Sequence, residues 1–251
     1  MPSDSARSES APRVAVVFAG GEGTRLQPYT TVLPKPLMPL GDKPIIEIIL
    51  RQLGAAGFEE VILAVGYLAE LIQTFVGNGH RFGVRVRYSM EVNRLGTAGP
   101  LSQIDDLPDD FLVMNGDVLS DLDYASLFES HLSSNAALTV AAYEKRERID
   151  FGVLEIGSDT QVISFREKPS VTTYISTGIY AVSREAISLI PKGQKLDFPD
   201  FIMMLLDRNI PVRAFFVKGV WLDIGRKRDY EEAIDTYSKD PARFLPPSVL
   251  S

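Results

Sequence analysis

The sequence of 251 residues contains no cysteine and only two histidines, His80 and His131. The absence of cysteine excludes disulfide bonds, thiolate zinc sites, iron–sulfur clusters and a cysteine nucleophile. With two histidines, the chain also has no HExxH motif and no multi-histidine metal site. A bound metal ion is therefore expected to be a hard cation held by carboxylates.

The sequence also lacks long apolar runs and an excess of positive charge. Its longest apolar stretches, Val14–Gly21 and Val61–Ala69, are far shorter than the ~20 residues that cross a membrane. The first ten residues contain no apolar segment typical of a signal peptide, so a cytoplasmic protein with no membrane partner is predicted. With 26 lysines and arginines against 33 aspartates and glutamates, the net charge is −7. This balance argues against a nucleic-acid partner, and a polyanionic ligand would have to meet a local cluster of cations.

Composition divides the chain into one large unit between two polar ends. Residues 1–12 hold four serines and two prolines and are expected to be a disordered tail. Residues 13–238 are predicted to form a single domain. Residues 239–251 contain Pro241, Pro246 and Pro247 and are predicted to be a proline-rich tail. No internal repeat is present, including the hexapeptide repeat of a β-helix domain.

The first half of the chain alternates apolar runs with helical patterns. Continuous apolar runs predict buried strands, and apolar residues at helical spacing predict a helix at residues 43–56, with Pro44 in its first turn. The strands are expected at Arg13–Ala19, Glu60–Val65, Val84–Tyr88 and Phe111–Met114, and a second helix at Ala69–Val76. Such a βαβ series predicts a Rossmann-like, doubly wound and mostly parallel sheet of the α/β class.

The second half is richer in strands and is predicted to add an antiparallel extension to this sheet. Its strands are expected at Ala137–Tyr143, Gly152–Ile156, Val162–Arg166, Tyr174–Val182 and Val212–Val217. Its helices are expected at Arg184–Leu189, Pro199–Asp207 and Lys227–Tyr237. The run Glu144–Asp150 is charged but of mixed sign, and it is predicted to be a solvated loop.

A glycine-rich loop, Gly20-Gly21-Glu22-Gly23-Thr24-Arg25-Leu26, follows the first predicted strand. Glycines let backbone N–H groups approach an anion without interference from a Cβ. The loop is no Walker motif, because no GK[ST] triplet is present, and no Rossmann GxGxxG, because Leu26 takes the last glycine position. We interpret it as a phosphate-binding loop of another kind that ends in an arginine. The alternative is an ordinary glycine-rich turn.

A lysine between two prolines follows shortly afterwards, in Leu33-Pro34-Lys35-Pro36-Leu37. The prolines predict an extended, stiff segment that holds the ammonium group with reduced flexibility. Alone, Lys35 would be interpreted as an exposed loop lysine. After a glycine-rich loop it becomes a candidate ligand for phosphate.

These two motifs, GGxGTRL at residues 20–26 and PKPL at residues 34–37, resemble the signature of the sugar-1-phosphate nucleotidyltransferases, also called NDP-sugar pyrophosphorylases. Four later segments fit the same family in the same order. They are Leu95–Leu101 (LGTAGPL), Asn115–Asp117 (NGD), Glu167–Pro169 (EKP) and Trp221–Gly225 (WLDIG). The resemblance covers residues 13–237, nearly all of the predicted domain, and implies that this domain is catalytic.

The resemblance implies a reaction in which a sugar 1-phosphate attacks the α-phosphorus of a nucleoside triphosphate and pyrophosphate leaves. It assigns Arg25, Lys35 and Asp117 to catalysis, where Arg25 offers bidentate donors and Lys35 a point charge. It also implies that Asp117 and Asp223 hold Mg²⁺, the expected cofactor. In isolation, Asp117 also fits a turn after Asn-Gly, and Asp223 fits the N-cap of the next helix.

The resemblance further assigns the substrate-binding residues. The nucleotide is expected at Gly20, Gly21, Gly23, Thr24 and Arg25 of the loop and at Gly96, Thr97 and Ala98, whose glycine lets a flat base approach closely. The sugar phosphate is expected at Gly152, Glu167, Lys168, Thr177 and Gly178. Ser176 stands where many relatives have asparagine.

The LGTAGPL segment is most similar to that of mannose-1-phosphate and heptose-1-phosphate guanylyltransferases. The expected partners are therefore GTP and a hexose or heptose 1-phosphate. UTP, dTTP and CTP stay open, as does a non-catalytic paralogue that binds sugar nucleotides and regulates an active enzyme. Many relatives carry a C-terminal left-handed β-helix for assembly or regulation, whose repeat this sequence does not show; assembly into a homo-oligomer is left open.

Overall fold

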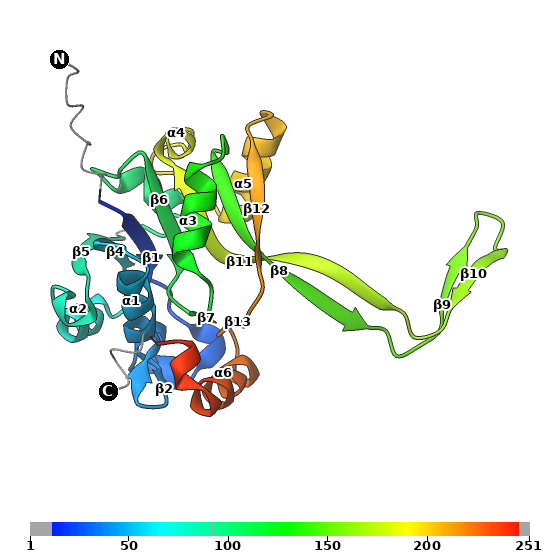
Figure 1. Cartoon of the computed structure of the whole chain (residues 1–251), viewed down its shortest axis with the longest axis horizontal. Coiled ribbons are helices and arrows are strands. Elements are labelled where there is room, and N and C mark those ends of the chain that lie inside the picture. The colour runs from blue at the N-terminus through cyan, green and yellow to red at the C-terminus, as the bar shows by residue number, and fades with distance from the viewer. Residues whose placement is uncertain (1–11, 92, 246–251) are drawn as a thin grey trace, which may run out of the picture.

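A computed structural model of the chain describes residues 12–91 and 93–245, with a seven-stranded sheet at its centre (Figure 1). In spatial order the strands are β12 (Val212–Val217), β8 (Leu138–Arg148), β11 (Ser170–Ser183), β6 (Asp110–Asn115), β1 (Val14–Phe18), β4 (Glu60–Val65) and β5 (Arg85–Met90). All neighbours pair in parallel except β11, which is antiparallel to both β8 and β6. The doubly wound, mostly parallel α/β fold with an antiparallel extension is confirmed.

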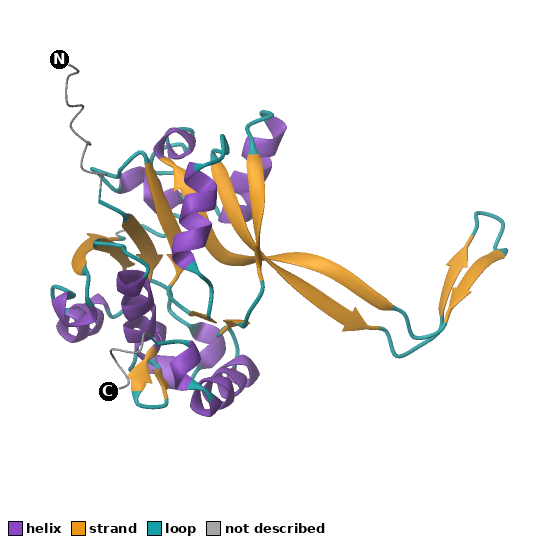
Figure 2. Ribbon diagram, in the orientation of Figure 1, coloured by secondary structure: helices purple, strands orange, loops and turns teal. Residues whose placement is uncertain are grey.

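Helices cover both faces of this sheet (Figure 2). One face packs against α1 (Ile45–Ala55), α2 (Ala69–Val76), α3 (Tyr124–Leu132) and α6 (Lys227–Lys239), and the other against α4 (Arg184–Ile187) and α5 (Phe198–Asp207). Short antiparallel pairs are formed by β2 (Pro39–Leu40) with β3 (Lys43–Pro44), β7 (Val118–Ser120) with β13 (Trp221–Asp223), and β9 (Val153–Ile156) with β10 (Val162–Arg166). Short 3₁₀ helices lie at Thr24–Leu26, Tyr29–Thr31, Lys35–Leu37, His80–Phe82, Gly99–Gln103 and Pro241–Arg243.

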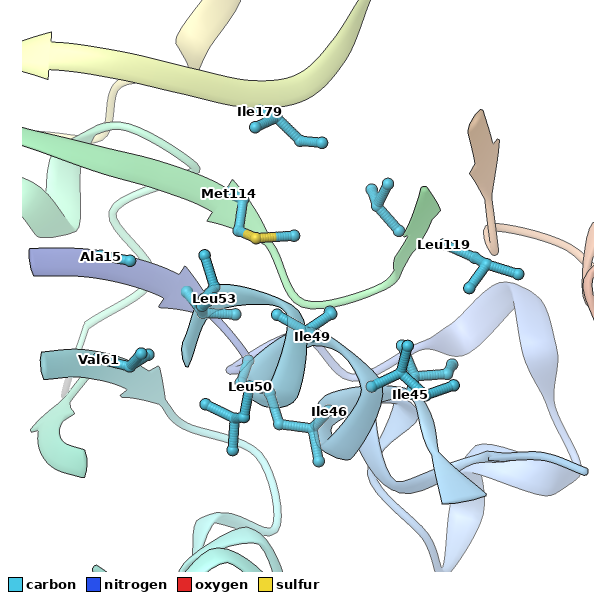
Figure 3. Packing of buried hydrophobic residues seen from close by; sticks show 14 of the residues in the cluster. Ala15, Ile45, Ile46, Ile49, Leu50, Leu53, Val61, Met114, Leu119 and Ile179 are labelled. Atoms are coloured by element: carbon cyan, nitrogen blue, oxygen red, sulfur yellow. The ribbon is translucent and has the colours of Figure 1, made fainter. Parts of the chain in front are cut away.

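Strand β1 is buried on both sides because its residues face two apolar cores in turn. Ala15 and Val17 belong to the core under α1, whereas Val14 and Val16 belong to the core under α5. This explains why the strand is a continuous apolar run in the sequence, without the alternation of a half-exposed strand. Figure 3 shows the first core, where the isoleucines and leucines of α1 pack between the sheet and β7.

Strands β8 and β11 continue beyond the sheet as a two-stranded arm (Figure 1). Their ladder runs without interruption from Ala142 opposite Ser176 to Arg148 opposite Ser170. The β9–β10 hairpin forms the end of this arm, away from the helices and the central sheet. The arm is the antiparallel extension that the sequence predicts, but most of its length makes no contact with either apolar core.

The prediction of a solvated loop at Glu144–Asp150 is wrong. Strand β8 extends through this charged run to Arg148, so most of the run is strand. Both faces of the arm are exposed here, so no apolar alternation marks the strand. Charged neighbours along the strand pair instead, as Arg146 does with Glu144 at 2.7 Å. A strand with two exposed faces shows no alternation of apolar and polar residues, so the sequence pattern does not predict it.

The predicted proline-rich tail is also partly wrong. Helix α6 extends to Lys239, and Phe244 and Leu245 after the 3₁₀ turn are buried. The ring of Phe244 lies 6.0 Å from that of Tyr237. Pro241 is tolerated because it occupies the first turn of a 3₁₀ helix, where no N–H partner is required. The N-terminal tail up to residue 11 and residues 246–251 lie outside the described residues.

None of the helices in the described part of the chain is both long enough and apolar enough to cross a membrane.

Candidate active site

The candidate site is a cleft at the carboxyl ends of β1, β4 and β6. Ligands of open α/β sheets bind at this edge, where the chain turns away from neighbouring parallel strands. The cavity has a volume of about 830 Å³. It is lined by Phe18, Gly20, Gly21, Glu22, Gly23, Thr24, Arg25, Gly66, Tyr67, Glu91, Arg94, Gly96, Thr97, Asn115, Asp117, Lys195, Asp197 and Asp223.

The three glycines of the loop after β1 serve different purposes. Gly23 has a φ of 61°, and a Cβ on it would come within 2.8 Å of Thr30 Cγ2. A Cβ on Gly20 would lie 3.1 Å from the backbone nitrogen of Gly66. A Cβ on Gly21, by contrast, would meet no atom within 4 Å. The fold therefore requires Gly20 and Gly23 to be small, whereas the missing side chain of Gly21 leaves room in the cleft for a ligand.

Lys35 lies at the start of the 3₁₀ turn Lys35–Leu37, in place of the extended segment that the two prolines predict. Its side chain is buried and its ammonium group forms an ion pair with Oδ2 of Asp117, just after β6. The other carboxylate oxygen of Asp117, Oδ1, is buried and has no hydrogen-bond partner among the described residues. Such an oxygen is costly unless a ligand completes its interactions.

The pairing of β13 with β7 brings Asp223 beside Asp117. Asp223 lies opposite Val118, and the backbone N–H of Ile224 donates a hydrogen bond of 3.0 Å to the carbonyl of Asp117. The alternative role of Asp223 as a helix N-cap is excluded, because Arg226 is the residue that precedes α6. The two carboxylates that the family resemblance singles out are thus neighbours in the fold.

Two cations lie close to these carboxylates. An added Cβ on Gly225 would lie 3.1 Å from Oδ2 of Asp223 and 3.4 Å from Nη2 of Arg25, so both side chains meet at this point. Desolvation and then the negative charge of Asp117 raise the pKa of Asp223, whereas Lys35 and Arg25 lower it. The site therefore combines two carboxylates that repel each other with cations that partly compensate them.

The carboxylate pair fits a magnesium ion. No group of three or more histidine, aspartate or glutamate side chains is arranged to hold a metal within residues 12–91 and 93–245. Mg²⁺ is usually bound by only one or two carboxylates, and substrate phosphates and water complete its shell. The unpartnered Oδ1 of Asp117 and the neighbouring carboxylate of Asp223 supply such an incomplete set of hard oxygen ligands.

The segment Gly96–Ala98 forms a second wall of the cleft by packing against the loop before α5. The backbone N–H of Thr97 donates to Oδ1 of Asp197 at 2.9 Å, and that of Ala98 donates to the carbonyl of Leu196 at 2.9 Å. A Cβ on Gly96 would come within 2.6 Å of the same carbonyl. Close packing of the protein itself thus accounts for this glycine. Thr97 and Gly96 line the cleft, whereas the side chain of Ala98 is buried beneath it.

Several charged and aromatic residues of the cleft were not singled out from the sequence. They are Glu22, Tyr67, Glu91, Arg94, Lys195 and Asp197. Arg94 forms an ion pair with Glu22, which connects the second wall to the glycine-rich loop. Lys195 and Asp197 come from the loop before α5, far along the chain, where no motif marks them. Only Glu22, inside the glycine-rich motif, carried a signal in the sequence.

Two of the predicted sugar-phosphate residues lie beside the cleft. Gly178 has a φ of 75°, and a Cβ on it would lie 2.4 Å from Nδ2 of the cleft residue Asn115. The backbone carbonyl of Thr177 accepts a hydrogen bond of 2.9 Å from the indole N–H of Trp221. Both residues are buried behind the cleft, so a ligand in the cleft would contact their backbone atoms.

The other three predicted sugar-phosphate residues are not brought to the cleft. Gly152, Glu167 and Lys168 lie at the hairpin end of the arm, and none of the described residues that line the cleft comes from the arm. A Cβ on Gly152 would come within 2.5 Å of the Phe165 ring, which is a structural reason for that glycine. The sugar-binding role of these three residues stays a prediction.

The chain matches the family described as Nucleotidyl transferase over residues 14–240. It belongs to the nucleotidyl transferase family. The family resemblance that the six sequence motifs indicate is therefore confirmed, and the match spans the whole of the central sheet together with α6. All motifs from the glycine-rich loop to Trp221–Gly225 lie inside the matched range.

Individual members of the nucleotidyl transferase family are similar to this chain over most of its length. It is 35% identical over 240 residues to UTP–glucose-1-phosphate uridylyltransferase from Synechocystis sp., covering 88% of this chain and 62% of that protein. It is 35% identical over 250 residues to mannose-1-phosphate guanyltransferase from Yarrowia lipolytica, covering 93% and 68%. The chain thus spans roughly two thirds of the length of these curated relatives.

Solved structures show the same fold. HddC from Yersinia pseudotuberculosis has a TM-score of 0.69 at 29% identity, covering 90% of this chain and 99% of that one. The same protein complexed with GMP-PN has a TM-score of 0.67 at 28% identity, with the same coverage. A putative glucose-1-phosphate thymidylyltransferase from Bacillus anthracis has a TM-score of 0.73 at 26% identity, covering 90% and 95%.

Proposed function

We propose that this member of the nucleotidyl transferase family transfers a nucleotidyl group from a nucleoside triphosphate to a sugar 1-phosphate and releases pyrophosphate, with Mg²⁺ as cofactor. The observation that carries the proposal is the meeting of Arg25, Lys35, Asp117 and Asp223 at the carboxyl edge of the sheet. Two relatives are named as enzymes of glucose 1-phosphate and mannose 1-phosphate, which supports a sugar 1-phosphate as the substrate.

In this reaction an oxygen of the sugar 1-phosphate forms a bond to the α-phosphorus of the triphosphate. The bond from that phosphorus to the pyrophosphate oxygen breaks, and pyrophosphate leaves with the electron pair. Arg25 is exposed in the cleft, and its planar guanidinium group matches the geometry of phosphate oxygens. Lys35 fixes the carboxylate of Asp117 in place through their ion pair. A bound Mg²⁺ would neutralise charge on the phosphates of both substrates.

We propose GTP as the nucleotide. The edge of guanine carries two neighbouring N–H donors, which suit carboxylate acceptors, whereas uracil carries one. Glu91 and Asp197 line the cleft, and each accepts hydrogen bonds from described residues through only one of its carboxylate oxygens. A guanyltransferase relative and the neighbour complexed with GMP-PN also support guanine. UTP is the alternative, because a uridylyltransferase is equally similar.

The test is pyrophosphate release with Mg²⁺ across five nucleoside triphosphates and a panel of hexose and heptose 1-phosphates. We expect release with GTP and one class of sugar. Asp117→Asn should lower kcat/KM at least ~100-fold, or about 2.7 kcal/mol, and Arg25→Ala should cost a comparable amount. Arg208→Ala, an exposed arginine outside the cleft, is the matched control.

Other outcomes would revise the proposal. A folded protein that releases no pyrophosphate from any pair would favour a regulatory paralogue. Turnover of Asp117→Asn near the wild-type rate at saturating Mg²⁺ would contradict the metal assignment. The cytoplasmic location expected from the sequence stays a prediction.

A further inference from the structure

Strand β11 is irregular where it passes behind the cleft. Its register with β8 shifts between Ser176 and Tyr180, so the residues between them form a bulge. The hydroxyl of Thr177 is buried and donates a hydrogen bond of 2.8 Å to the carbonyl of Ala141 on β8. Gly178 has a φ of 75°, in the left-handed region. The bulge is therefore held in a defined shape, and bulges are over-represented beside active sites.

One side of this bulge contacts the strand that carries Asp223. Trp221 and Asp223 are alternate residues of β13 and share a face of it. The indole N–H of Trp221 donates a hydrogen bond of 2.9 Å to the carbonyl of Thr177, and its ring lies 5.8 Å from the ring of Tyr143. Trp221 is thus attached to β11 by a hydrogen bond and to β8 by ring packing.

The other side of the bulge contacts the segment that carries Asp117. A Cβ on Gly178 would lie 2.4 Å from Nδ2 of Asn115, so this glycine lets β11 approach the Asn115 side chain closely. Asn115 is the last residue of β6 and stands two positions before Asp117. The bulge at Thr177 and Gly178 therefore touches both segments that supply the carboxylates of the proposed metal site.

The strand that carries Asp223 depends on few attachments. Among the described strands β13 pairs with β7 alone, and both are three residues long (Figure 1). Two short strands are marginally stable by themselves. In the described chain, the indole hydrogen bond of Trp221 is the only one that joins β13 to the central sheet. Because Asp223 and Asp117 repel each other, a loosened β13 would let the two carboxylates separate.

We propose that Trp221 is a positioning residue for the metal site: its hydrogen bond to the bulge of β11 keeps the carboxylate of Asp223 close enough to Asp117 for one ion to bind both. The inference rests on the proposed function, because it takes the two carboxylates to share a metal ion. Residues that orient metal ligands without touching the ion typically contribute about 10–100-fold to metal affinity. Loss of the indole N–H should therefore weaken metal binding at least about tenfold.

Packing alone is the competing role of Trp221, since its ring also contacts Tyr143. Two variants separate the contribution of the N–H from that of the ring. Trp221→Phe keeps an aromatic ring on β13 but has no N–H to donate. Tyr143→Leu keeps the indole hydrogen bond and removes the ring that packs against it. A tryptophan that only packs would lower stability in both variants and change metal affinity in neither.

The first measurement is the binding of Mn²⁺ alone to the full-length protein, followed by the electron paramagnetic resonance signal of the free ion. Mn²⁺ stands in for Mg²⁺ because it is also bound by hard oxygen ligands. Trp221→Phe should raise the Kd for Mn²⁺ at least about tenfold, whereas Tyr143→Leu should leave it within about twofold of the wild type. Asp223→Asn gives the Kd expected when this ligand is absent. An unchanged Kd in Trp221→Phe, or an equal rise in both variants, would overturn the proposal.

A second pair of variants covers the case in which Trp221→Phe does not fold. Thr177→Val removes the hydroxyl that bonds to Ala141 and so loosens the bulge, but it leaves Trp221 in place. Thr177→Ser keeps a hydroxyl at the same position. Weaker Mn²⁺ binding is expected in Thr177→Val and not in Thr177→Ser. Equal Kd values in these two variants would contradict a role for the bulge in the metal site, whatever the stability of Trp221→Phe.

Pyrophosphate release separates this inference from the proposed function. In Trp221→Phe the Mg²⁺ concentration for the half-maximal rate should rise at least about tenfold, and the rate should recover as Mg²⁺ is added. An active enzyme in which Trp221→Phe leaves both the Mn²⁺ and the Mg²⁺ dependence unchanged would reject the positioning role alone. A protein in which Trp221→Phe weakens Mn²⁺ binding, but which releases no pyrophosphate from any substrate pair, would reject the proposed reaction alone. A wild type that binds no Mn²⁺ would reject the shared metal and the positioning role together.

Discussion

Lys35 and Asp117, 82 positions apart in the chain, form an ion pair with only 9% and 26% of their side chains exposed. The pair ties the turn after the glycine-rich loop to the end of β6. It occupies one oxygen of the carboxylate and leaves the other, Oδ1, without a partner in the described chain. Lys35 thus contributes to the stability of the fold and also fixes the carboxylate that is proposed to hold the metal.

Because Lys35 and Asp117 form an ion pair, the effects of replacing them on the free energy of unfolding should be strongly coupled. Asp117→Asn or Lys35→Ala alone leaves one buried group without its counter-charge and should lower the free energy of unfolding by about 2–4 kcal/mol. The double variant should lose less than the sum of the two, with a coupling energy of roughly 1–3 kcal/mol. Urea unfolding of the four proteins measures this. Simple additivity would show that the two side chains do not interact in solution.

The glycine-rich loop predicts a separation of stability from binding. Gly21→Ala adds a Cβ that meets no protein atom, so the free energy of unfolding should change by less than ~0.5 kcal/mol. The same methyl group lies where a phosphate would approach, so kcat/KM should fall at least about tenfold. Thermal unfolding and steady-state kinetics measure the two effects.

Gly23→Ala is the matched control in the same loop. Its φ of 61° and its closeness to Thr30 should cost about 1–3 kcal/mol of stability. If Gly21→Ala were instead the destabilised variant, with substrate affinity intact, the loop would be a structural turn.

Replacement of Asp223 should lower activity without lowering stability. Partial burial and then the negative charge of Asp117 disfavour its charged form and raise its pKa. Asp223→Asn removes this charge, so the free energy of unfolding without metal should not fall by more than ~0.5 kcal/mol. The same change removes a proposed metal ligand, so kcat/KM should fall at least ~100-fold. Denaturant unfolding without Mg²⁺, next to kinetics with it, decides. A strong loss of stability would mean that Asp223 is mainly structural.

The parts of the fold that the sequence predicts well are those where burial leaves a pattern. The runs at Glu60–Val65 and Val212–Val217 and the helix Ala69–Val76 lie where they are expected. Only the family motifs predict that Asp117 and Asp223 lie close together. Their contact depends on the short β7–β13 pair, whose residues carry no signal of pairing.

The sequence does not predict several other features of the fold and the cleft, for physical reasons. The sequence does not predict helix α3, because its nine residues are only weakly amphipathic. The arm strand through Glu144–Arg148 has no buried face, so no periodicity marks it. Lys195 and Asp197 join the cleft only because the loop before α5 packs on Gly96, a tertiary contact that local sequence does not encode.

His131 predicts how stability depends on pH. It is buried, with Nδ1 2.8 Å from Thr139 Oγ1 and Nε2 3.2 Å from Asp110 Oδ1. Burial lowers its pKa, and Asp110 opposes this only in part. In the unfolded chain a histidine takes up a proton below about pH 6.5, whereas the folded state resists it. The free energy of unfolding should therefore decrease as the pH falls from 7 to 5.

Two variants isolate this effect from the other titrating groups. His131→Asn should be less stable at pH 7, because it loses part of a buried hydrogen-bond network, but its decrease in stability from pH 7 to pH 5 should be smaller than that of the wild type. His80→Asn, at the only other histidine, which is exposed, should keep the wild-type pH dependence. Urea unfolding at both pH values measures each slope. An unchanged slope in His131→Asn, or a smaller one in His80→Asn, would contradict a buried neutral His131, because the proton uptake would then occur elsewhere.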